Sequence, residues 1–218
     1  DQTANERRFF SPPKWTYVDE KDVVAIVSGN RARPRSSDVQ NRIYVIIDAG
    51  WVLDEFGKNT GTLDTIMENA DGLTTRSGDP LPTNSTGTLP WYLDLPTVGE
   101  KGLGSPAIIK TEEGDDILLF TTYIPSLPQA GTCVFDEGVG NLYALDLLTG
   151  SSGFAKLDAG TEESSIETAP GIPPEINLLY KHDKDDGSVQ ITAQIGNELL
   201  PVIKGLRPKQ IFWLQKAD

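Results

Sequence analysis

An apolar run that leads directly into a turn constrains the fold of this chain more than any other feature of its sequence. Leu142–Leu145 contains only apolar and aromatic residues, which predicts a strand buried on both faces. Asp146 follows at the strand exit, where its carboxylate is expected to accept backbone N–H groups of the turn. Thr149 can bond other backbone groups there, and Gly150 supplies a position with positive φ. Phe154 then begins the predicted returning strand, so the segment is interpreted as a β-hairpin.

Similar short apolar runs recur along the whole chain, with turn residues between them, and they fall into three groups. The runs are Asp22–Ser28, Arg42–Asp48 and Trp91–Leu95 in the first group, Ala107–Lys110, Ile117–Tyr123, Asn141–Leu147 and Phe154–Leu157 in the second, and Ile176–Lys181, Val189–Ile195, Leu199–Lys204 and Gln210–Leu214 in the third. Two loops between paired runs, Glu112–Asp116 and Asp183–Gly187, have the Asp-rich, Gly-containing composition of hairpin tips. The pattern predicts an all-β fold of about three four-stranded propeller blades, in groups 1–95, 104–160 and 172–218.

Composition supports an all-β chain and excludes two classes of partner. The 21 Gly and 15 Pro fall mostly between the apolar runs, which favours many turns over helices. The formal net charge of −13 argues against binding to nucleic acid, because phosphates select for basic patches. The same charge argues against anionic lipid surfaces. The sequence contains no apolar stretch long enough to predict a membrane span or a signal peptide.

Residues 54–88 interrupt the first group and are rich in Gly, Thr, Asn, Asp and Ser. A short helix is predicted over Thr62–Ala70, where four apolar residues share one face at helical spacing. The simpler interpretation of this insertion is a surface excursion with one docked helical turn. The alternative is a binding loop, since recognition often lies on insertions carried by a rigid scaffold.

Several segments follow one another in an order that resembles a known family. In chain order they are Arg7–Phe10, Ile26–Arg31, Asp38–Tyr44, Trp91–Leu95, Gly99–Lys101, Gly104–Ile109, Leu118–Pro125, Cys133 and Leu142–Asp146. This series resembles the C-terminal domain of type IV pilus biogenesis factors and tip-associated adhesins of the PilC/PilY type, over residues 7–48 and 90–175. The turn pattern Ala144-x-Asp146-x-x-Thr149-Gly150 also resembles the blade signature of quinoprotein-type propellers, in which Trp usually stands in place of Phe154.

The resemblance implies a partial quinoprotein-like β-propeller and a non-enzymatic function. The expected protein is an exported bacterial surface protein at the pilus tip, acting in adhesion and in control of pilus assembly and retraction. Its expected partners are pilins or minor pilins, a host or surface ligand, and the upstream part of the same propeller. Because the sequence starts at Asp1 without Met, it is interpreted as a segment of a longer precursor.

Two alternatives remain open at this stage. One is a propeller fragment of a quinone-dependent dehydrogenase, because the blade signature is shared with those enzymes. Their cofactor site uses paired Cys, Arg, Trp and calcium-binding acids, and no such constellation is evident in the sequence. The other is an outer-membrane scaffold built on a similar propeller.

No catalytic or cofactor-binding residues are predicted. His182 is the only histidine, it sits beside a predicted hairpin tip, and no nucleophile elbow accompanies it. Cys133 is the only cysteine, so in an exported protein it is either free or bridged to a partner outside this sequence. Zinc-ligand spacings and phosphate-binding glycine loops are absent from the sequence.

The best internal candidates for a metal site are Asp183, Asp185 and Asp186. Together with Gly187 they resemble the start of a calcium loop, but Lys184 lies among them and the downstream bidentate Glu is missing. We therefore interpret them as a solvated hairpin tip and expect calcium only in the complete protein. The aromatic residues are assigned to the core and to packing between blades: Trp15, Tyr17, Trp91, Tyr92, Phe120, Tyr123, Phe154 and Trp213.

Overall fold

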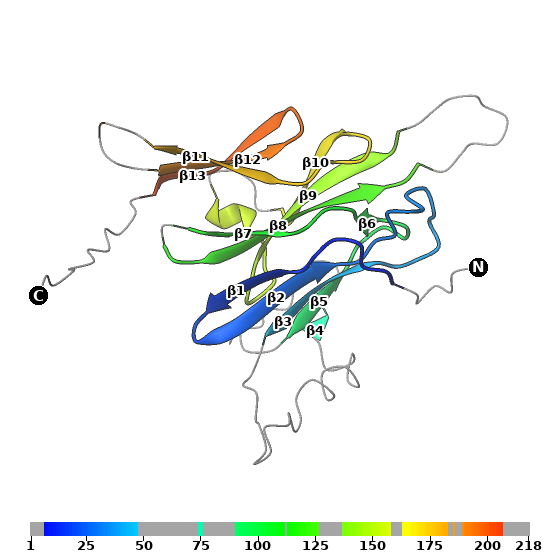
Figure 1. The fold of residues 1–218 in the computed structure, drawn as a ribbon, viewed down its shortest axis with the longest axis horizontal. Helices are drawn as coiled ribbons and strands as arrows, with labels where there is room; N and C mark the ends of the chain where they lie inside the picture. The colour runs from blue at the N-terminus through cyan, green and yellow to red at the C-terminus, as the bar shows by residue number, and fades with distance from the viewer. Residues whose placement is uncertain are drawn as a thin grey trace, which may run out of the picture.

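The computed structural model describes residues 7–47, 74–75, 90–111, 113–126, 137–157, 163–182, 185 and 189–206. The fold is all-β, as the sequence predicts, and its strands form three sheets whose long pairings are antiparallel. Figure 1 shows the sheets as successive layers, in the order in which the chain forms them. Among the described residues the only helical element is a single 3-10 turn. The sheets form an open stack and do not close into a ring, so the predicted propeller remains a proposal.

The first sheet has the strand order β1-β2-β3-β5-β4. Its strands are β1 (Lys14–Val18), β2 (Lys21–Val27), β3 (Arg42–Ile47), β4 (Thr74–Thr75) and β5 (Trp91–Asp94). The predicted runs correspond to β2, β3 and β5, whereas β1 and the two-residue β4 were not predicted. Apart from β4, the insertion at 54–88, including the helix predicted over Thr62–Ala70, lies outside the described residues.

The second sheet has the order β10-β9-β8-β6, with β7 also paired to β8. Its strands are β6 (Lys101–Gly102), β7 (Ala107–Lys110), β8 (Asp116–Ile124), β9 (Val139–Asp146) and β10 (Ser165–Pro170). The predicted hairpin between Lys110 and Asp116 is present, since these two residues pair directly.

The prediction of a fourth strand at Phe154–Leu157 is wrong. After the turn, the chain returns only as far as one bridge between Leu145 and Ser152. Phe154–Lys156 then forms a 3-10 helix, and the strand that pairs with the free edge of β9 is β10, so the second group extends beyond residue 160. Phe154 is nevertheless fully buried, because a turn can direct an aromatic side chain into the core as well as a strand can.

The third sheet has the order β11-β12-β13. Its strands are β11 (Asn177–His182), β12 (Val189–Ile195) and β13 (Glu198–Leu206), which match three of the four predicted runs. The fourth run, Gln210–Leu214, and with it Trp213, lies outside the described residues.

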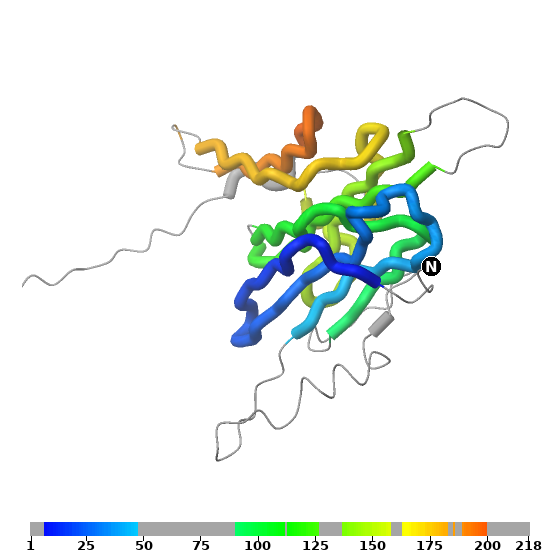
Figure 2. Tube along the Cα trace, turned by 45° about the vertical axis from the view of Figure 1, so that its right-hand side comes forward, coloured from blue at the N-terminus to red at the C-terminus, as the bar shows by residue number. Residues whose placement is uncertain are grey.

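The three sheets pack face to face, and the second sheet is buried on both sides. Leu118 and Phe120 of β8 join Val45 and Trp91 of the first sheet in one core cluster. The alternate residues of the second sheet pack with Val189–Ile195 of the third sheet in another cluster. Figure 2 shows the same order of layers from a second direction. Double-sided burial explains why β8 contains the unbroken apolar run Ile117–Phe120 and β9 the run Leu142–Leu145, since neither face meets solvent there.

Candidate functional site

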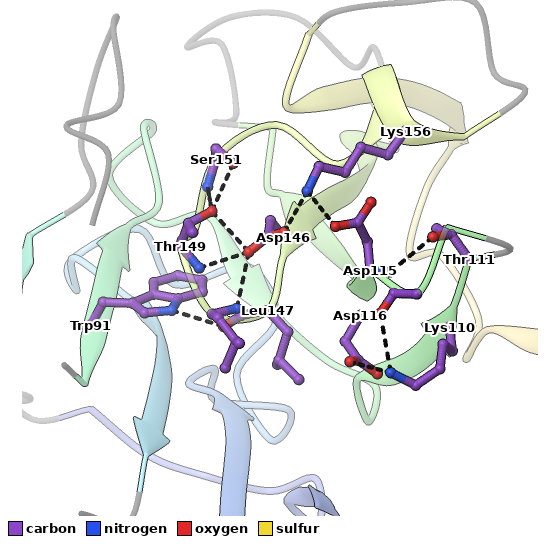
Figure 3. A network of polar contacts seen from close by, with 12 residues as sticks. Trp91, Lys110, Thr111, Asp115, Asp116, Asp146, Leu147, Thr149, Ser151 and Lys156 are labelled. Carbon is purple, nitrogen blue, oxygen red and sulfur yellow. Dashed lines mark hydrogen bonds and ion pairs between the residues drawn. The ribbon is translucent and has the colours of Figure 1, made fainter. Parts of the chain in front are cut away.

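The turn at the end of β9 is organised by the Asp146 carboxylate (Figure 3). Oδ1 of Asp146 accepts the backbone N–H groups of Leu148 and Thr149, at 3.1 and 2.7 Å, and the Thr149 hydroxyl at 2.8 Å. The N–H of Gly150 donates to the Asp146 carbonyl at 2.8 Å, and the φ of Gly150 is +68°. A side chain at position 150 would be strained in this left-handed conformation. The residues of the predicted turn motif therefore bond one another.

Two lysine side chains form ion pairs with three carboxylates at this end of the second sheet. Lys156 Nζ lies 2.7 Å from Asp146 Oδ2 and 3.0 Å from Asp115 Oδ1, and Lys110 Nζ lies 2.6 Å from Asp116 Oδ2. Burial opposes ionisation of Asp146, but its bonds to Lys156 and Thr149 outweigh burial and hold its pKa below the ordinary value. The lysine ammonium groups thus neutralise the neighbouring carboxylates, which indicates that these acids have a structural role.

One hydrogen bond connects this turn to the first sheet. The indole Nε1–H of Trp91, at the start of β5, donates to the Leu147 carbonyl at 2.9 Å (Figure 3). The Trp91 side chain is fully buried between the two sheets. A buried indole N–H needs an acceptor, so this bond fixes where the turn of one sheet sits on the next.

A buried carboxylate lies at a second contact between the first and second sheets. Glu100 is 1% exposed, and its Oε1 accepts Thr122 Oγ1–H at 2.5 Å, Tyr143 Oη–H at 2.9 Å and Asn141 Nδ2–H at 3.4 Å. Its backbone carbonyl accepts Asn41 Nδ2–H at 2.7 Å. Burial, followed by the charge of Glu100, raises the pKa of the Tyr143 phenol. Glu100 thus bonds to the second sheet with its side chain and to the loop before β3 with its backbone.

Lys101 follows Glu100 and points to the first sheet. The residue is 2% exposed, and its Nζ donates to the carbonyls of Pro34, at 2.7 Å, and Ser36. Burial lowers the pKa of Lys101 to about 8, and the nearby Asp38 carboxylate acts in the opposite direction. The lysine therefore holds the loop between β2 and β3 against β6.

The backbones of the first and second sheets also approach each other closely at this contact. The N–H of Gly102 donates to the Ser28 carbonyl at 3.0 Å. A Cβ atom at Gly29 would lie 2.1 Å from the Gly102 carbonyl oxygen, so only glycine fits at position 29. The Ser-Gly-Asn turn and the Gly-Glu-Lys segment of the sequence therefore meet here.

The outer face of the first sheet, turned away from the second sheet, is largely apolar. Strand register assigns ten side chains to it: Trp15, Tyr17, Asp22, Val24, Ile26, Arg42, Tyr44, Ile46, Tyr92 and Asp94. Trp15 and Tyr17 are each 60% exposed, so the assignment of these two residues to the core is wrong. Tyr92 is only partly buried, whereas Trp91, Phe120, Tyr123 and Phe154 are core residues as predicted.

The sequence of β2 indicates that the outer face of the first sheet is apolar. Val23, Val24, Ala25, Ile26 and Val27 are all apolar, whereas a strand with one solvated face alternates with polar residues. The run therefore indicates a sheet with apolar side chains on both faces. No comparable signal marks Glu100 as buried.

The candidate metal and bridging residues are mostly not described. Asp183, Asp186 and Cys133 lie outside the described residues, and Asp185 lies in a turn between β11 and β12. Within the described ranges, no three His, Cys, Asp or Glu side chains are grouped so that they could hold a metal ion. His182 is the exposed last residue of β11.

No protein-family model, curated protein or solved structure matches the chain. Among the described residues, no helix is long and apolar enough to span a membrane.

Proposed function

We propose that this chain is a non-enzymatic surface protein of type IV pili, acting at the pilus tip in adhesion and in control of pilus assembly and retraction. In this proposal the three sheets are blades of a partial quinoprotein-like β-propeller, exported to the cell surface. Pilins or minor pilins are the expected protein partners, and the stacked sheets serve as a rigid platform for them.

One observation carries the proposal: the segments that resemble the pilus family make the contacts between sheets. Trp91, from the Trp91–Leu95 segment, bonds to the turn that follows the Leu142–Asp146 segment. Glu100 and Lys101, from the Gly-Glu-Lys segment, connect the second sheet to the first. The segments that resemble the family in their order along the chain are therefore also in contact with one another in the fold.

The stacking of the sheets also supports the blade interpretation. In a propeller each inner sheet packs against a neighbour on both faces, and the second sheet has this environment. The ion pairs of Lys156 with Asp146 of the β9 turn and with Asp115 favour a structural role of the blade signature over a metal-dependent one.

Deletion of the gene in the source bacterium tests the pilus function. We expect few pili on the surface of the deletion strain, and we expect further deletion of the retraction motor to restore them, because a retraction-control factor is dispensable without retraction. Gold-labelled antibody against the chain should mark the cell surface and pilus tips of the parent strain. Normal piliation of the deletion strain, with label absent from pili, would contradict the proposal.

A binding experiment separates this function from the dehydrogenase alternative. The purified chain is titrated with minor pilins of the same bacterium and, separately, with pyrroloquinoline quinone plus calcium. The proposal expects saturable binding of a pilin and none of the quinone. Saturable quinone binding that requires calcium would instead support a dehydrogenase-type propeller.

A further inference from the structure

The loop between β2 and β3 places three arginine side chains in solvent. Residues 30–36, which form the arginine loop, have the sequence Asn-Arg-Ala-Arg-Pro-Arg-Ser, and Arg31, Arg33 and Arg35 are all exposed. Arg8 is also exposed and lies beside the start of the loop, since its carbonyl accepts the N–H of Gly29 at 2.8 Å. Figure 1 shows the loop at one end of the first sheet, beside β6. Four exposed arginines therefore lie on neighbouring stretches of backbone.

The positive charge of these arginines is not neutralised within the described part of the chain. Elsewhere in that part, three cations form ion pairs with aspartates: Arg42, Lys110 and Lys156. No ion pair among the described residues joins an acid to Arg8, Arg31 or Arg33. The sequence has 32 Asp or Glu and only 19 Lys or Arg, so acids are in excess. Unpaired arginines at one place on such a chain indicate a site for an anionic partner.

The backbone of the arginine loop is held in two consecutive turns. The N–H of Arg33 donates to the Asn30 carbonyl at 3.1 Å, and the N–H of Ser36 donates to the Arg33 carbonyl at 3.2 Å. The buried Lys101 donates to the carbonyls of Pro34 and Ser36, and the proline ring fixes φ at position 34. The loop therefore presents its arginines on an ordered backbone, which lowers the entropy lost when a partner binds.

The residue type and the surrounding charge indicate which anion fits. A guanidinium group donates two parallel N–H groups to one carboxylate or phosphate. Residues 7–47 carry eight Lys or Arg and four Asp or Glu, a net charge of +4, so the rest of the chain carries −17. A nucleic acid or an anionic bilayer extends beyond the loop and would meet this acidic remainder. The five residues 31–35 span at most about 17 Å, which matches a short peptide segment.

We propose that the arginine loop binds a short acidic segment of a partner protein, whose Asp or Glu carboxylates pair with Arg31 and Arg33. Arg8 and Arg35 add positive charge on either side of these two groups. A single exposed ion pair contributes little to affinity, so several pairs have to form together on the ordered loop. Binding is therefore weak and decreases as salt screens the charges.

Fluorescence anisotropy of a labelled octaglutamate peptide, titrated with the purified chain, tests the proposal. We expect saturable binding with a dissociation constant below about 1 mM at about 0.05 M salt, and a rise of at least about fivefold at about 0.3 M salt. Arg31→Gln/Arg33→Gln should raise the dissociation constant at least about fivefold at the lower salt concentration. The matched control, Lys21→Gln/Lys181→Gln, removes the same charge elsewhere and should change it less than about twofold. Circular dichroism and urea unfolding verify that both variants fold.

Three results would overturn the proposal. The first is the absence of saturable peptide binding at the lower salt concentration. The second is an equal loss of binding in the two double variants, because net charge and not the arginine loop would then determine affinity. The third is tighter binding of an octathymidine oligonucleotide than of octaglutamate, which would indicate a nucleic-acid site. The test does not depend on the pilus function, because it uses the purified chain alone.

Discussion

Among single residues, Glu100 makes the clearest energetic prediction. Its carboxylate is buried, accepts hydrogen bonds from Thr122, Tyr143 and Asn141, and forms no ion pair among the described residues. Glu100→Leu should lower the free energy of unfolding by about 2 kcal/mol or more, since the hydroxyl donors lose their acceptor. Urea unfolding measures the change.

A double-mutant cycle provides the control for Glu100. Tyr143→Phe removes one donor, so Glu100→Leu/Tyr143→Phe should cost less than the sum of the two single changes. Glu100→Gln keeps an acceptor oxygen and should cost less than Glu100→Leu. Additive costs in the cycle would show that Glu100 and Tyr143 do not interact in the folded chain.

Lys101 predicts a dependence of stability on pH. Its pKa is about 8 in the folded chain and near the ordinary 10.5 when unfolded. Between these values the unfolded chain holds a proton that the folded chain has released, so stability rises with pH and stays constant below pH 8. The gain between about pH 7 and 9.5 should be on the order of 1 kcal/mol, because solvent screening reduces the effect of burial on the amine.

The variant Lys101→Met isolates this effect. Urea unfolding of both proteins from about pH 7 to 9.5 should show the rise in the wild type and not in the variant. Tyr143 does not interfere in this range, because burial raises its pKa, so its ionisation reduces stability only at higher pH. Parallel pH profiles of the two proteins would exclude Lys101 as the titrating group.

At the scale of the elements, the β9 turn predicts the effect of a backbone change. Gly150 has a φ of +68°, so Gly150→Val should lower the free energy of unfolding by about 1–3 kcal/mol through strain. Gly150→Asn should cost less, because Asn tolerates the left-handed conformation. Thermal and urea unfolding compare the two, and equal costs would contradict the strain explanation.

The Asp146 side chain of the same turn predicts a cost that depends on pH. Asp146→Ala should cost about 1 kcal/mol or more at neutral pH, since two backbone donors and the Thr149 hydroxyl lose an acceptor. The folded-state pKa of Asp146 is lowered, so its stabilisation is present above the ordinary pKa and is lost as pH falls. The difference between variant and wild type should therefore shrink in acid, and a difference independent of pH would contradict the charged role.

The elements also show how far the sequence determines the fold. The apolar runs Ile117–Phe120 in β8 and Leu142–Leu145 in β9 were predictable, because a strand segment buried on both faces needs apolar residues at successive positions. The strand β10 was not, since its sequence Ser-Ile-Glu-Thr-Ala-Pro carries little apolar pattern and its position depends on β9. The prediction of a strand that begins at Phe154 was wrong, because a buried aromatic residue fits a 3-10 turn as well as a strand.

Of the candidate site residues, only those whose hydrogen bonds form within one turn could be predicted from the sequence. The bonds of Asp146, Thr149 and Gly150 form within one turn, so residue types and spacing suffice to predict them. The environment of Glu100 depends on Asn141 and Tyr143, which are distant in sequence. The exposure of Trp15 depends on which sheet face meets a neighbour, and short-range pattern does not specify this.

For the whole molecule, the blade interpretation depends on the double-sided burial of the second sheet. Leu118 and Phe120 pack against the first sheet, and Ile117 and Leu119 pack against the third. Strands in such a position open only when the stack unfolds, whereas edge strands such as β1 and β11 can open locally.

Native-state hydrogen exchange followed by mass spectrometry measures this order of stability. Peptides from β8 and β9 should exchange most slowly, with an opening free energy equal to the global free energy of unfolding from urea titration. Peptides from β1 and β11 should exchange faster. The stacked arrangement of the three sheets would be contradicted if β8 and β9 exchanged as fast as the edge strands. It would also be contradicted if the opening free energy of β8 and β9 lay well below the global free energy of unfolding.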